Sequence, residues 1–68
     1  MTDELYNSML VYALNVELGD LLDIKRGRPS LFYGGFRNQH GRPPTDEEIQ
    51  KEIDRVSQER EEAMKRIQ

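Results

Sequence analysis

The stretch KRGRPSLFYGGFRNQHGRP, residues 25–43, differs from both of its flanks in charge, aromatic content and glycine content. It has no acidic residue, and its basic residues are Lys25, Arg26, Arg28, Arg37 and Arg42. Both flanking segments are net acidic and carry apolar residues at helical spacing. We therefore expect an all-α protein with helices near residues 2–24 and 45–67, joined by a basic, aromatic connector near residues 25–44.

The length of 68 residues leaves room for one small domain, which we expect to span residues 1–68. The chain has no cysteine, which favours a reducing compartment. Its acidic opening, residues 1–4, lacks the basic start of a secretory signal. The longest unbroken apolar run, residues 9–14, is far shorter than the about 20 residues that span a bilayer. We therefore expect a cytoplasmic protein without membrane contact.

The first predicted helix begins at Thr2, a good N-cap residue followed by two acids that complement the helix dipole. Its apolar residues form two overlapping stripes at helical spacing. One stripe consists of Leu5, Met9, Tyr12 and Val16, and the other of Leu10, Leu14, Leu18 and Leu21. The pattern continues past Gly19, so we expect the helix to include this glycine, although it costs about 1 kcal/mol relative to alanine.

The two stripes merge at residues 9–14, where apolar side chains cover most of the helix circumference. One thin second helix cannot cover all of this surface. We expect the surplus to bind a second copy or another protein, with Met9, Leu10 and Leu14 in the contact, and a closed homodimer is the commoner solution. Leu10→Asp or Leu14→Asp is then expected to disrupt both association and folding, because a buried unpaired charge is costly in either place.

A Gly-Arg-Pro phrase occurs twice in the connector, and each copy precedes a residue that can cap a helix. At the second copy, Thr45 and Glu48 have the spacing of a capping box, which predicts the start of the second helix. At the first copy, the sequence predicts a short turn through residues 31–33 that Gly34 and Gly35 terminate.

The aromatic residues of the connector have two open interpretations, a lid that folds back on the first helix or an exposed anchor for a partner. In a partner-binding role, we expect Phe32, Tyr33 and Phe36 to carry more binding energy than the arginines beside them, because aromatic side chains bury large areas with few rotamers to fix. Arg28 and Arg37 would act mainly on the rate of encounter.

The residues at 26–29, Arg-Gly-Arg-Pro, resemble the core of the AT-hook, a motif that lays an Arg-Gly-Arg strand along the narrow minor groove of AT-rich DNA. The AT-hook pattern has a proline where this chain has Lys25, and the net charge of −3 repels phosphate overall. The resemblance implies an alternative function, a dimeric nucleic-acid-binding protein that uses the basic residues of the connector. These residues are Lys25, Arg26, Arg28 and Arg42.

The second predicted helix has a single narrow apolar seam with four-three spacing. Its positions are Ile49, Ile53, Val56, Ala63 and Ile67, with Arg60 in the one polar slot. Two helices of this length would each measure about 35 Å. We therefore expect an antiparallel two-helix hairpin that dimerisation or a partner completes.

No recognisable nucleophile, base and orienting group occur together, and no phosphate-binding glycine loop is present, so we expect a protein that is not an enzyme and needs no cofactor. Glu17, Asp20 and Asp23 follow one another at spacings of three, which is typical of a solvated helix face. His40 has no second histidine or cysteine with which to bind a metal. The sequence favours a small protein-binding regulator or accessory subunit that docks through the first helix and the aromatic connector.

Overall fold

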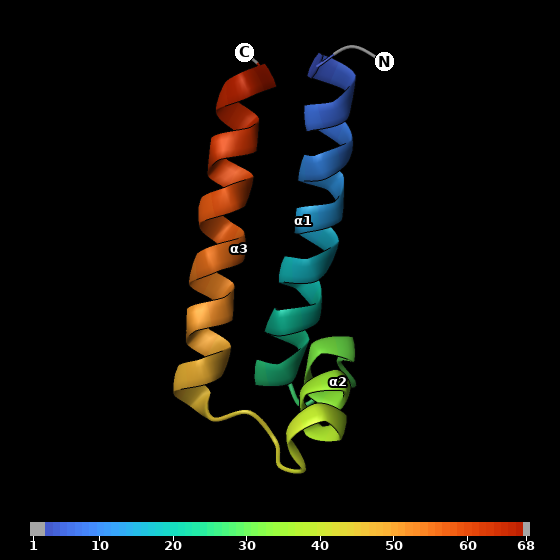
Figure 1. Cartoon of the computed structure of the whole chain (residues 1–68), viewed down its shortest axis with the longest axis vertical. Helices are drawn as coiled ribbons and strands as arrows, with labels where there is room; N and C mark the ends of the chain where they lie inside the picture. The colour runs from blue at the N-terminus through green and yellow to red at the C-terminus, as the bar shows by residue number, and fades with distance from the viewer. Residues whose placement is uncertain (1–2, 68) are drawn as a thin grey trace.

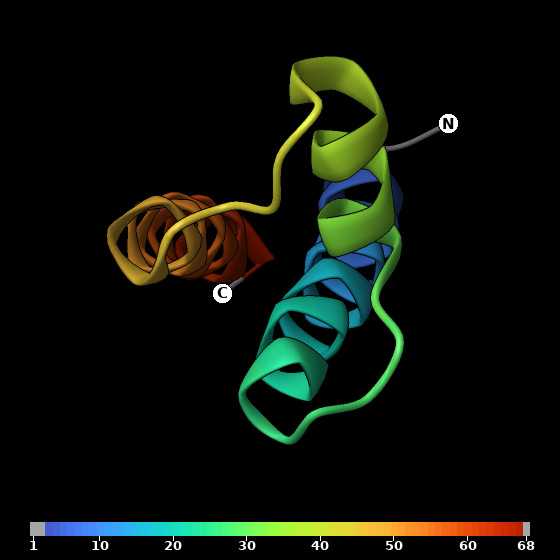
Figure 2. The same cartoon turned by 90° about the horizontal axis from the view of Figure 1, so that it is seen from below.

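The computed structural model describes residues 3–67, which form three α-helices and no strand. These are α1 (Asp3–Lys25), α2 (Leu31–His40) and α3 (Asp46–Ile67). Helices α1 and α3 run antiparallel along the long axis of the molecule, and α2 packs on the C-terminal end of α1 (Figure 1; Figure 2). The all-α prediction is confirmed. Within the same residues, no helix combines the length and the apolarity needed to cross a membrane.

The core lies between α1 and α3, where the predicted seam of α3 is buried. Its buried residues are Ile49, Ile53, Val56 and Ala63. Helix α1 contributes Asn7, Leu14 and Leu21, which are spaced by seven residues and therefore share one side of the helix. Arg60 occupies the polar slot of the seam, and its Nε donates a hydrogen bond to Asn15 Oδ1 of α1.

Helix α1 ends one residue beyond its predicted end and includes Gly19, as the apolar pattern predicted. The predicted cap Thr2 lies outside the described residues. At the other end, the N–H of Gly27 donates to the Ile24 carbonyl at 3.1 Å, and the N–H of Arg28 donates to the Asp23 carbonyl at 2.9 Å. Gly27 has a φ of 73°, so these bonds form a Schellman motif that requires the left-handed conformation glycine tolerates.

The connector differs from its prediction, because it contains a helix, α2. The two-helix prediction is wrong, because residues 31–40 form a third helix that includes Gly34 and Gly35 instead of ending at them. Ser30 is its N-cap and accepts a hydrogen bond from the Tyr33 N–H at 3.2 Å. The helix ends at Gly41, which has a φ of 68°. The chain therefore caps α2 at both ends and leaves only short linkers.

Helix α3 begins with the predicted capping box. The N–H of Thr45 donates to Glu48 Oε1 at 2.9 Å, and the N–H of Glu48 donates to Thr45 Oγ1 at 3.2 Å. The Arg42 guanidinium also holds both carboxylate oxygens of Glu48, at 2.8 and 3.1 Å. These bonds, first from Arg42 and then from the Thr45 backbone, lower the pKa of Glu48 from 4.5 to about 2.

We expect acid to weaken this capping box. Because folding lowers the pKa of Glu48 from 4.5 to about 2, its contribution is present above about pH 4.5 and is lost as the pH falls toward 2. In urea denaturation, the free energy of unfolding of the wild type should therefore exceed that of Glu48→Gln at pH 5, and this difference should shrink toward pH 2. A difference of the same size at every pH would contradict this role for the Glu48 carboxylate.

Candidate docking surface on the first helix

One side of α1 carries large apolar side chains that α2 and α3 leave more than half exposed. We call this side the α1 outer face, and it consists of Leu5, Met9, Tyr12 and Val16, which are 52%, 56%, 72% and 56% exposed. At about 100° per residue, these positions lie opposite the buried positions at which α1 meets α3. The outer face is one of the two stripes that the sequence shows, and the other stripe packs against α3.

The α1 outer face lies in a segment without charge. Residues 5–16 contain no acidic or basic side chain, although 34% of all residues in the chain are charged. At 1.5 Å per residue, this uncharged segment is about 18 Å long. Tyr6, which is 57% exposed, lies on one flank of the face. Exposed apolar area of this kind, on an otherwise highly charged small protein, marks a surface for association.

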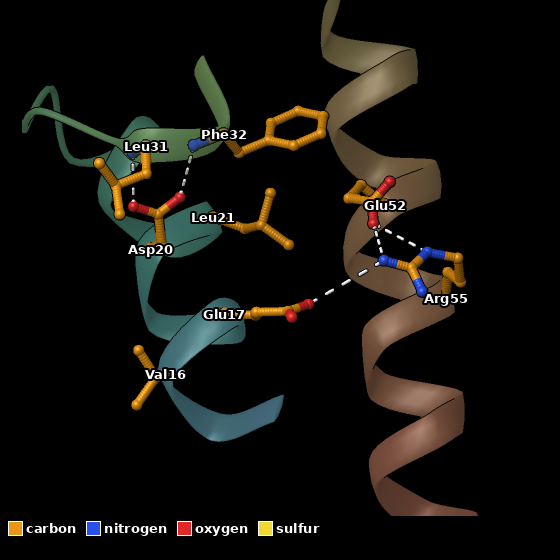
Figure 3. Close-up of a pocket in the computed structure, with 8 residues that line it drawn as sticks. All are labelled: Val16, Glu17, Asp20, Leu21, Leu31, Phe32, Glu52 and Arg55. Atoms are coloured by element: carbon orange, nitrogen blue, oxygen red, sulfur yellow. Dashed lines mark hydrogen bonds and ion pairs between the residues drawn. The ribbon is translucent and has the colours of Figure 1, made fainter. Parts of the chain in front are cut away.

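At its C-terminal end, the α1 outer face meets a pocket of about 390 Å³ between the three helices (Figure 3). In Figure 3, Val16 and Leu31 lie on the side away from α3, while Phe32 extends from α2 toward α3 above Leu21. Leu31 is 88% exposed and so extends the apolar surface from α1 onto α2. The pocket is lined by Val16, Glu17, Asp20, Leu21, Leu31, Phe32, Glu52 and Arg55.

The polar rim of the pocket is neutralised internally. Arg55 of α3 pairs with Glu52, and with Glu59 at 2.7 Å. Its guanidinium also lies 4.0 Å from the Glu17 carboxylate of α1, so it bridges the two long helices (Figure 3). The rim therefore offers no unpaired cation from Arg55 to a charged ligand, and the apolar wall is its main binding feature.

Asp20 fixes the position of α2 on α1. Its carboxylate accepts hydrogen bonds from the Ser30 hydroxyl at 2.7 Å and from the N–H groups of Leu31 and Phe32 at 2.7 and 3.0 Å (Figure 3). Partial burial raises the pKa of Asp20, but these bonds from Ser30, Phe32 and Leu31 together lower it below its usual 3.8. The sequence interpretation of Asp20 as a solvated acid missed this role.

The three residues of the first helix that were predicted to bind a partner differ in their exposure to solvent. Met9 lies on the α1 outer face, Leu10 is half-buried, and Leu14 is 3% exposed within the core. Leu14 therefore offers no surface to a partner while the helices stay packed. Tyr12 is more exposed than Met9, at 72% against 56%. Its spacing in the sequence placed Tyr12 in an apolar stripe, but Tyr12 was not assigned to the site.

The predicted aromatic residues of the connector are all half-buried in α2. Phe32 packs against the core, while Met9 and Tyr12 of the apolar surplus on the first helix stay more than half exposed. Phe36 lies 4.2 Å from the His40 ring between centroids, and the Arg42 guanidinium carbon lies 5.1 Å from the Phe36 ring centroid. Tyr33 donates its backbone N–H to the cap Ser30. The side chains of Phe32 and Phe36 therefore have structural partners, and Leu31 is the exposed apolar residue of α2.

Four of the five basic residues of the connector also have partners. Arg26 and Arg28 lie 3.9 and 4.0 Å from the Asp23 carboxylate, and Lys25 Nζ donates to Gln50 Oε1 at 3.1 Å. Arg42 binds the α3 capping box, whereas Arg37 is exposed in the last turn of α2. In the Arg-Gly-Arg-Pro stretch, residues 26 and 27 lie in the turn that ends α1, and the N–H of Arg28 closes the Schellman motif.

The α1 outer face, with Leu31 beside it, is therefore the main uncovered apolar surface of the described residues. The chain matches no protein-family model, and neither curated proteins nor solved structures give a significant match.

Proposed function

We propose that the protein is a small, non-enzymatic protein-binding regulator or accessory subunit that docks through the α1 outer face and the adjoining Leu31. The observation that carries this proposal is the exposure of Met9 and Tyr12, at 56% and 72%, within an uncharged helix segment. Leaving these side chains in water forgoes roughly 25 cal/mol for each Å² of apolar area that a partner would cover.

The contact is centred on Tyr12. A tyrosine supplies a large rigid area, and its hydroxyl remains able to form a hydrogen bond at the edge of an apolar contact. Met9 lies less than one turn away and adds a flexible side chain that adapts to the shape of a partner. Asp20 supports this surface from behind, because its carboxylate accepts bonds from the N–H groups of Leu31 and Phe32 and so holds Leu31 at the pocket that Val16 also lines.

The expected result is that Tyr12→Ala weakens association by about 2 kcal/mol, because a central aromatic anchor accounts for a large share of binding energy. Gln58→Ala, on the exposed side of α3, is the matched control and should bind like the wild type. Association is measured as self-association by sedimentation and as affinity capture of other proteins from cells of the source organism. Circular dichroism confirms that both variants keep their helices.

Binding that survives Tyr12→Ala and Met9→Ala unchanged would contradict the proposal. The alternative of nucleic-acid binding through Arg26 and Arg28 makes a different prediction in the same experiment. Neutralising these arginines would abolish binding, and affinity for DNA in a gel shift would fall steeply with added salt, because phosphate contacts release counterions.

A further inference from the structure

We propose that the partner of the α1 outer face is α1 of a second copy, packed antiparallel about a two-fold axis between Leu10 and Val11. This inference rests on the proposed function, because it names the partner of the same surface. In the resulting dimer, each α1 lies between its own α3 and the α1 of the second copy, so both of its apolar stripes are covered.

The spacing of the outer-face residues is the first support. The intervals in Leu5, Met9, Tyr12 and Val16 are four, three and four, which is the same sequence of intervals in either chain direction. An antiparallel copy centred between residues 10 and 11 therefore places Leu5 opposite Val16 and Met9 opposite Tyr12. The two-fold axis repeats each of these contacts, as an isologous interface requires.

Charge is the second support. Residues 5–16 carry no charge, so they offer no complementary group to a charged partner. A second copy presents the same uncharged segment. The nearest acids in α1 are Glu4 and Glu17, which the proposed register places at the same level along the paired helices. At about 100° per residue they lie on opposite flanks of the outer face, and the two-fold axis brings equal flanks together. The two carboxylates are therefore kept apart, so a second copy meets no like-charge contact there.

The area available is the third support. The outer face and the flanking Tyr6 expose roughly 600 Å² per copy, so a dimer that covered all of this area would bury roughly 1,200 Å² in total, which is the lower end of the range for specific interfaces. A closed dimer of this size fits a small domain whose core is limited to one seam. Covering this area gives the domain apolar burial that α3 alone does not supply.

The pocket next to Val16 receives a side chain in the same arrangement. Tyr6 lies on the flank of α1 that also carries Glu17 and Asp20, which line the pocket. In the antiparallel register, Tyr6 of the second copy lies level with residue 15 of the first. Helical side chains lean toward their own N-terminus, so its ring leans toward the mouth formed by Val16 and Leu31. The two copies thus exchange tyrosines at the two pocket mouths.

The absence of native cysteine makes the register directly testable. Leu5→Cys and Val16→Cys chains are prepared separately, mixed in equal amounts and oxidised mildly. The antiparallel dimer should give mainly the mixed disulfide, which joins one chain of each variant. Leu5→Cys alone should give little product, because the two positions in that dimer are about 16 Å apart along the helix axis. A dominant product from Leu5→Cys alone would show parallel pairing and overturn the inference.

Sedimentation tests the assembly without cysteine. The wild type should be a dimer, and Tyr12→Glu should raise the dimer Kd at least about 100-fold, since two central anchors are lost per dimer, while helix content is kept. Tyr12→Ser serves the same purpose if the charged variant folds poorly. A wild type that stays monomeric at its highest soluble concentration overturns the inference. If that monomer captures another protein through Tyr12, the proposed function stands, and if its capture is insensitive to Tyr12, both fail.

Discussion

Replacing Leu21 by alanine should lower the free energy of unfolding by about 2–5 kcal/mol, because the change removes a buried side chain and leaves a cavity. Leu21 is 2% exposed and packs in the cluster formed by α1 and α3, with Phe32 of α2 against the same cluster. A domain of this size has little stability to spare. Chemical denaturation followed by circular dichroism would measure the loss.

The control for this experiment is the same chemical change at an exposed site. Leu31→Ala removes an identical group from a side chain that is 88% exposed, so its cost should stay within about 0.5 kcal/mol. Both variants should be compared at a protein concentration low enough to keep them monomeric, because Leu31 adjoins the proposed interface. Equal losses for Leu21→Ala and Leu31→Ala would contradict the core described here.

Helix α3 was the most predictable part of the fold. Its capping box is a local motif in which Thr45 and Glu48 satisfy each other's backbone groups, so a short stretch of sequence suffices to locate the start. Its apolar residues lie on one side only, which leaves a single way to bury them. The predicted and observed bounds therefore differ by one residue at the start.

Helix α1 shows what periodicity leaves open. Both stripes were visible in the sequence, but either could have faced α3, because Leu14 and Met9 are similarly apolar. The choice depends on packing against α3, where positions 7, 14 and 21 form the seam. Sequence alone therefore predicted a surplus apolar surface without showing that Tyr12 and Val16 form its exposed part.

Helix α2 was missed because its stability is not local. Gly34 and Gly35 each cost about 1 kcal/mol relative to alanine in a helix interior, which favours ending the turn there. The compensating contacts come from residues distant in sequence, since Asp20 binds its first N–H groups and Phe32 packs against the core. A helix of ten residues is also too short to persist alone in water. Its formation therefore depends on α1.

We expect Asp20→Ala to release α2 from α1 and to cost about 1–2 kcal/mol, because the Ser30 hydroxyl and two backbone N–H groups lose a charged acceptor. The effect should be local. Amide hydrogen exchange should speed up across residues 31–40, while residues 46–67 keep their protection. The lowered pKa of Asp20 gives the same result a pH dependence: its stabilising effect is present above its usual 3.8 and is lost as the pH falls through the lower folded value.

Asp23→Ala is the matched control, since it removes the same carboxylate one turn later in α1. The Asp23 carboxylate lies 3.9 and 4.0 Å from the guanidinium groups of Arg26 and Arg28, and exposed pairs of this kind contribute under about 1 kcal/mol. Exchange in residues 31–40 should therefore stay slow in Asp23→Ala. If both variants release α2 equally, negative charge near the end of α1 matters more than the three hydrogen bonds of Asp20. If neither does, the packing of Phe32 is sufficient to hold α2, and Phe32→Ala then becomes the change that should free it.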